Sequence, residues 1–157
     1  MGVPGAVISA FLDNASYKPM DQTVIVAALA RMNGVGHKDL FVRRASLAPS
    51  CDLAFFTRTR VELLAEQYNR VERFVDFVDI QGIPLNQTRS GKVVAVVALD
   101  ELAWTKQVSD FVAVMDQDIK QRKLGNSVEV RISGTATPMA KEGLRERGWK
   151  LFENIAR

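Results

Sequence analysis

The sequence predicts an α+β fold in which an N-terminal helical cluster packs on a small mixed sheet. Residues 1–72 contain several segments whose apolar residues recur at helical spacing. Residues 73–157 instead alternate strand-type and helical segments in the order ββαβαβ. Strand–helix–strand units place their strands parallel, so the last βαβαβ part is expected to be half-Rossmann-like, that is, to resemble half of a doubly wound domain.

Four helices are predicted in the first part. Residues 5–12 form the first, and residues 23–32 form the second, which is apolar nearly all round and is therefore expected to be buried. Residues 37–45 form the third. The longest helix begins after Ser50, whose hydroxyl suits an N-cap, and Asp52 in its first turn complements the helix dipole.

The next segment fits two structures. Residues 71–80 could extend the long helix, but their enrichment in Phe, Val and Ile favours a strand, which we predict over residues 75–83. A polar loop is expected over residues 84–91. Residues 92–99 are almost continuously apolar, which is typical of a central strand covered on both faces.

A helix is expected from Asp100, as its N-cap, to about residue 123. Its inner stripe is predicted to contain Trp104, Val108, Phe111, Met115 and Ile119.

The last segment is predicted to be a strand, a tight loop, a short helix and a closing strand. Residues 128–132 alternate apolar and charged side chains, the pattern of a half-buried strand. Thr137 suits the N-cap of the short helix, Pro138 suits its first position, and Gly148 lies where a helix would stop. The closing strand is expected to contain Trp149, Leu151 and Phe152.

Length and composition indicate one globular domain. The chain has 157 residues, of which 47% are hydrophobic and 25% charged. The net charge is +3, with 18 acidic residues interspersed among 21 basic ones, so nucleic-acid binding is not favoured. Cys51 is the sole cysteine, which excludes an internal disulfide and a cysteine-based zinc site.

The sequence shows no targeting or membrane signal. The longest apolar runs are too short to span a bilayer, and the first residues lack the pattern of a signal peptide, so a cytoplasmic location is slightly favoured. The abrupt start is compatible with excision from a longer, bacterial protein.

One candidate ligand site lies where the parallel strands are expected to end. Open α/β sheets bind ligands at that edge, and amides at a helix N-terminus can bind an anion. The candidate residues are Asp100, Trp104, Ser133, Gly134, Thr135 and Thr137. The alternative is that the segment is simply a well-capped turn. Asp100 and Glu153 are too few carboxylates to predict a metal site.

A second candidate surface is basic. If the third and fourth helices pack antiparallel, four arginines could meet and bind a partner or nucleic acid: Arg43, Arg44, Arg58 and Arg60. His37 is the only histidine and has no identifiable nucleophile beside it, so no catalytic residues and no cofactor are predicted.

These observations favour a non-catalytic interaction or structural domain whose partner is another protein or another domain of its parent chain. The first alternative is a small-ligand or anion-binding domain that uses the edge around Asp100 and residues 133–138. The second alternative is weak nucleic-acid binding through the four arginines.

Overall fold

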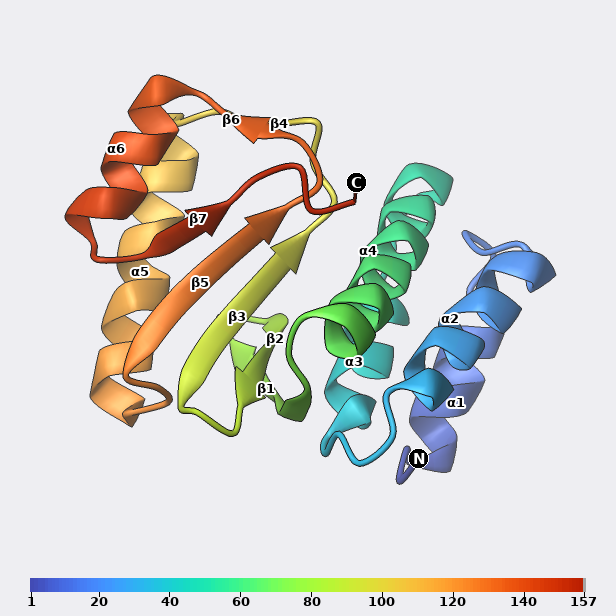
Figure 1. Cartoon of the computed structure of the whole chain (residues 1–157). Helices are drawn as coiled ribbons and strands as arrows, with labels where there is room; N and C mark the ends of the chain where they lie inside the picture. Colours follow the sequence, from blue (N-terminus) through green and yellow to red (C-terminus); the bar gives the residue numbers. More distant parts are fainter. Residues whose placement is uncertain (157) are drawn as a thin grey trace.

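The computed structural model describes residues 1–156 and confirms the α+β class (Figure 1). The helices are α1 (Gly5–Leu12), α2 (Pro19–Arg31), α3 (Lys38–Ala45), α4 (Cys51–Arg70), α5 (Lys106–Arg122) and α6 (Pro138–Glu146). The strands are β1 (Phe74–Ile80), β2 (Ile83–Thr88), β3 (Lys92–Val97), β4 (Glu101–Leu102), β5 (Ser127–Ile132), β6 (Thr135–Ala136) and β7 (Lys150–Phe152).

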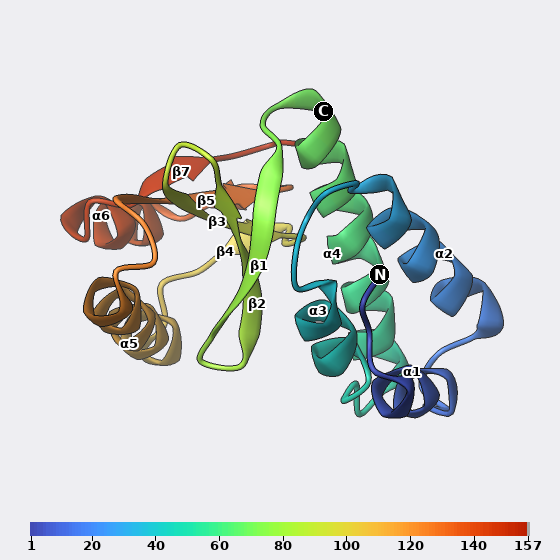
Figure 2. The same ribbon diagram turned by 90° about the horizontal axis from the view of Figure 1, so that it is seen from below.

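The main sheet is mixed, with strand order β1-β2-β3-β5-β7. The first three strands are antiparallel neighbours, whereas β3, β5 and β7 run parallel, as the two strand–helix–strand units predict. The short strands β4 and β6 form a separate parallel pair. Figure 2 shows the sheet between two helical layers, with α1 to α4 on one side and α5 and α6 on the other.

Both faces of the sheet are therefore buried, and residues 1–156 form two cores. Val94 and Val96 of β3 face the core shared with α1 to α4, whereas Val93 and Ala95 face the core shared with α5 and α6. Successive side chains of a strand point to opposite faces, so an apolar run such as that of β3 supplies both cores.

The prediction of a polar loop over residues 84–91 is wrong for residues 84–88, which belong to strand β2. Gln81 and Gly82 have φ values of 54° and 81°, and positive φ at both positions is what a two-residue hairpin turn requires. Pro84 is tolerated because β2 pairs with β3 only through Asn86 and Gln87, so its first residues have an open edge.

The helix predicted from Asp100 begins later. Thr105 is the N-cap of α5 and accepts a hydrogen bond from the amide of Val108, while residues 101–102 form β4. The prediction that Asp100 caps this helix is wrong. Trp104 consequently precedes the helix instead of starting its inner stripe.

Strand β5 is not half-buried as its alternation predicts. Glu129 and Arg131 are only 4% and 3% exposed, because α4 covers their face of the sheet. Arg131 Nη2 lies 2.8 Å from Glu129 Oε2, and Lys92 Nζ lies 3.1 Å from Glu129 Oε1. Burial opposes ionisation of Glu129, but these hydrogen bonds outweigh it and hold its pKa below the ordinary value.

The connection between α2 and α3 is tied to β1. Gly36 N donates to Val75 O and Phe77 N donates to Gly36 O, each at 2.9 Å. Beside this bridge, the exposed His37 places Nδ1 2.6 Å from Asp76 Oδ1. The hydrogen bond to the Asp76 carboxylate, followed by its charge, raises the pKa of His37.

We expect the His37 imidazole to titrate above about 6.5 and to return toward that value in Asp76→Asn. The chain has a single histidine, so its ring protons give one unambiguous NMR titration curve. The pKa of His37 is higher in the folded than in the unfolded chain, so its ion pair with Asp76 stabilises the fold. This stabilisation is fully present at pH values below the pKa of His37 in the unfolded chain, and it is lost as the pH rises through the pKa of His37 in the folded chain. Identical titration curves for the two proteins would refute the pairing.

Candidate functional site

The predicted strand-end site is occupied by the chain's own hydrogen bonds. Five consecutive amides donate to chain oxygens: Ser133 to Val97 O, Gly134 to Leu99 O, Thr135 to Asp100 O, Ala136 to Glu153 Oε1, and Thr137 to Leu102 O. Four of the acceptors are carbonyls of residues 97–102, which run beside this loop and include β4. None of the five amides is left to bind an anion in this arrangement.

Gly134, Thr137 and Ser133, which were also predicted at that edge, contact other parts of the chain and so help to hold the turn in place. A Cβ atom on Gly134 would lie 1.9 Å from Asp100 O, so only glycine allows this close approach. Thr137 is the N-cap of α6, as predicted, and accepts from the amide of Ala140. Ser133 Oγ donates to Leu99 O. The edge thus resembles the well-capped turn that was its alternative interpretation.

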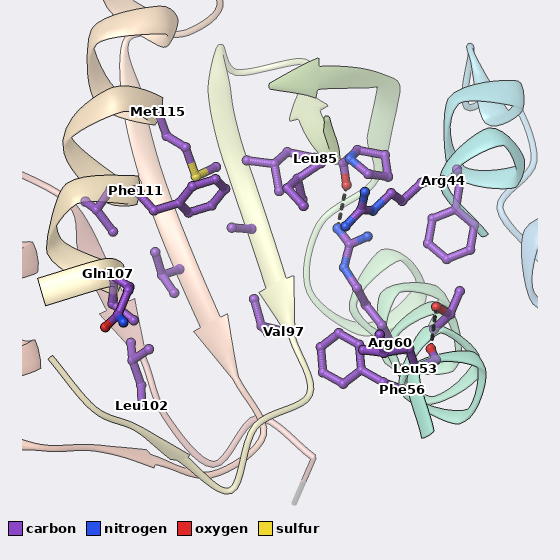
Figure 3. A pocket seen from close by; sticks show the side chains of 18 of the residues that line it. Arg44, Leu53, Phe56, Arg60, Leu85, Val97, Leu102, Gln107, Phe111 and Met115 are labelled. Atoms are coloured by element: carbon purple, nitrogen blue, oxygen red, sulfur yellow. Dashed lines mark hydrogen bonds between the residues drawn. The ribbon is translucent and has the colours of Figure 1, made fainter. Parts of the chain in front are cut away.

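An apolar groove lies elsewhere, between α5 and the corner of α3 and α4 (Figure 3). Its volume is about 810 Å³. The floor comes from β2, β3 and β5 and includes Leu85, Ala95, Val97 and Val130. The wall formed by α5 and the segment before it includes Leu102, Trp104, Val108, Phe111 and Met115. The opposite wall includes Phe41, Ala45, Leu53 and Phe56.

The groove reaches through the sheet because β2 diverges from β3. Their pairing ends at Asn86 and Val94, and the later residues of β3 have no β2 partner. Arg60 of α4 fills this gap: its Nε donates to Val96 O at 3.0 Å and its Nη2 donates to Pro84 O. One guanidinium therefore satisfies a carbonyl on each of the two separated strands.

Arg60 is a buried cation, 8% exposed, that borders the groove. Burial, with a smaller contribution from the nearby positive charge of Arg44, lowers the pKa of Arg60 to about 10, so it stays charged at neutral pH. Its guanidinium carbon lies 5.6 Å from the centre of the Phe41 ring, a cation–π distance.

The four arginines of the predicted basic surface do not form one patch. Arg43 Nε lies 3.3 Å from Asp39 Oδ2, and Arg58 Nη1 lies 2.8 Å from Asp21 Oδ1. Arg44 and Arg60 are brought together instead, at one end of the groove (Figure 3). Half of the predicted set thus lies in a site that the sequence did not reveal.

Trp104 is the one residue of the predicted ligand site that lines this groove. Its indole packs on α6 at Gly143, where an added Cβ would lie 2.3 Å from Trp104 Cε2. Phe111 is 43% exposed and completes the same wall. Helical spacing alone pointed to Phe111 as a core residue, and it could not indicate that the side chain faces an open groove.

A second cavity, of about 550 Å³, lies between the C-terminal end of α4 and strands β3, β5 and β7. Its charged lining residues are Glu72, Lys92, Glu129 and Arg131. These four neutralise one another: Lys92 Nζ contacts both carboxylates, and Arg131 Nη2 does the same. The cavity therefore offers no unmatched charge to a ligand.

Within residues 1–156, no group of three or more His, Cys, Asp and Glu side chains could hold a metal ion. No helix in that range has both the length and the apolar composition needed to cross a bilayer. No protein-family model, curated protein or solved structure matches the chain. Inferences about its function are therefore drawn from the geometry and chemistry of its own residues.

Replacing Arg60 by Met is expected to lower the free energy of unfolding by about 2–4 kcal/mol, because two buried carbonyls lose their donor. Urea denaturation measures this change. Arg44→Met is the matched control: Arg44 is exposed and has no hydrogen-bond or ion-pair partner in the described part of the chain, so its change should stay within about 0.5 kcal/mol. Equal effects of the two substitutions would contradict the bridging role of Arg60.

Proposed function

We propose that this protein is a non-catalytic binding domain that holds a small, mostly apolar organic molecule in the groove between α5 and the α3–α4 corner. The supporting observation is the groove itself. Its volume of about 810 Å³ and its apolar lining fall within the range of small-molecule sites, which span about 300–1,000 Å³ and contain few polar groups.

The rim of the groove exposes apolar side chains that a ligand would cover. Leu47, Leu53 and Phe111 line the groove and are 68%, 48% and 43% exposed. Covering apolar surface contributes roughly 25 cal/mol per Å², so a ligand of modest size gains affinity here without many hydrogen bonds. This supports a hydrophobic ligand over a strongly polar one.

Two earlier hypotheses have weaker support. Binding of a partner protein or of another domain remains a prediction, since nothing in residues 1–156 identifies such a partner. Nucleic-acid binding would require free cations, but Arg58 is paired with Asp21 and Arg60 is buried in the sheet gap. The proposal therefore keeps the small-ligand alternative and moves it from the strand-end edge to the groove.

Fluorescence titration with the neutral fluorophore phenylnaphthylamine tests the proposal. We expect saturable binding at about one site per chain. Phe111→Asp puts a charge into the wall and should weaken binding about tenfold, which corresponds to about 1.4 kcal/mol.

Val114→Asp is the matched control, because Val114 is on the same helix, is 46% exposed and does not line the groove. It should change the affinity less than about twofold. Absence of saturable binding, or equal loss in both variants, would overturn the proposed function.

A further inference from the structure

The charged lining of the groove is entirely positive. Of its 25 lining residues, two are arginines, Arg44 and Arg60, and none is Asp or Glu. Neither arginine forms an ion pair with any residue in the range 1–156. Arg60 is the buried one of the two, and a cation buried beside apolar surface is normally paired, because an unpaired buried charge is costly.

Arg60 is held in a fixed orientation. Its Nε and Nη2 are used by Val96 O and Pro84 O, while Nη1 has no hydrogen-bond partner among the residues that the structure describes. Arg44 approaches from α3, and Figure 3 shows the two side chains reaching toward one another at the same end of the groove. The site thus combines one rigid and one adaptable guanidinium.

Guanidinium groups bind carboxylates through charge-assisted hydrogen bonds, which are about twice as strong as neutral ones. An anion at this point would also offset the repulsion between the two cations. That repulsion contributes to the lowered pKa of Arg60, so the electrostatics agree with the geometry.

The remainder of the groove selects an apolar body. Away from the two arginines, few lining residues carry polar side-chain groups. The Thr57 hydroxyl already donates its hydrogen bond to Leu53 O. The amide of Gln107 lies on the α5 side of the groove (Figure 3). A ligand that is charged throughout would bury unpaired groups against Ala95, Val97 and Phe111.

Building on the proposed function, we propose that the ligand is a monocarboxylic acid with an apolar body, bound with its carboxylate between Arg44 and Arg60. The apolar body then lies over β3 toward the wall formed by Trp104, Phe111 and Met115.

Three probes with the same ten-carbon chain test this inference: decanoate, decanol and decyltrimethylammonium. Isothermal titration calorimetry gives the affinities, and the NMR signal of the Met115 methyl group reports whether the probe enters the groove. We expect decanoate to bind at least about tenfold more tightly than decanol, and the cationic probe to bind most weakly.

Arg44→Met should lower the preference for decanoate over decanol, taken as the ratio of their dissociation constants in the same variant, from at least about tenfold to about twofold or less. Arg43→Met is the control, because Arg43 is the neighbouring arginine, is paired with Asp39 and does not line the groove. It should retain the preference. Arg60 is left intact in this experiment because its removal is expected to destabilise the fold.

The outcomes separate the two proposals. If decanol and decanoate bind equally, or if Arg44→Met keeps the preference, the carboxylate inference is overturned while the proposed function stands. If decanoate binds without shifting the Met115 signal, the site is elsewhere and the inference is overturned. If neither the three probes nor phenylnaphthylamine binds, both proposals are overturned.

Discussion

The fold depends on one guanidinium group, that of Arg60, which lies where the hydrogen-bonded pairing of β2 and β3 ends. Beyond Asn86 and Val94, strand β2 leaves β3, and two main-chain carbonyls would be buried without donors. Arg60 donates a hydrogen bond to each of these carbonyls, and because its backbone lies in α4, it links that helix to both strands. A buried cation is costly to desolvate, but two carbonyl acceptors and the Phe41 ring offset part of that cost. Both the divergence of the sheet and the groove below it depend on this arrangement.

The same interaction explains why the groove combines apolar walls with positive charge. Closing the sheet would have required β2 to stay paired with β3 beyond Val94, alongside Ala95 and Val97, which now line the groove. The hairpin turns away instead, and a positively charged side chain remains at the opening. A binding site of this kind arises from an incomplete sheet rather than from a loop rich in functional groups, which is why it has few polar residues.

Local patterns were enough to predict most elements, because caps, turns and apolar periods act within a few residues. Thr137, Pro138 and Gly148 delimit α6 as predicted. Strand β2 was missed because its polar residues and Pro84 resemble a loop, although the Gln81–Gly82 turn was a usable signal. Glu129 and Arg131 were assigned to solvent because a period of two cannot reveal what covers the second face. The groove could not be predicted, since α3, α4, α5 and three strands meet there only in the folded chain.

The bridge made by Arg60 also determines how the chain can be divided. By sequence, residues 1–72 and 73–157 look like a helical half and a sheet half. In the folded molecule, a side chain from the first half completes main-chain hydrogen bonding in the second, and Gly36 pairs with β1 across the same boundary. Some buried polar groups have partners in the other half, as Arg60 does at Val96 O and Pro84 O, and as Arg131 does at Gln67 Oε1. Gene fusion or recombination would therefore have to transfer both segments together, so the unit of inheritance is the whole described chain.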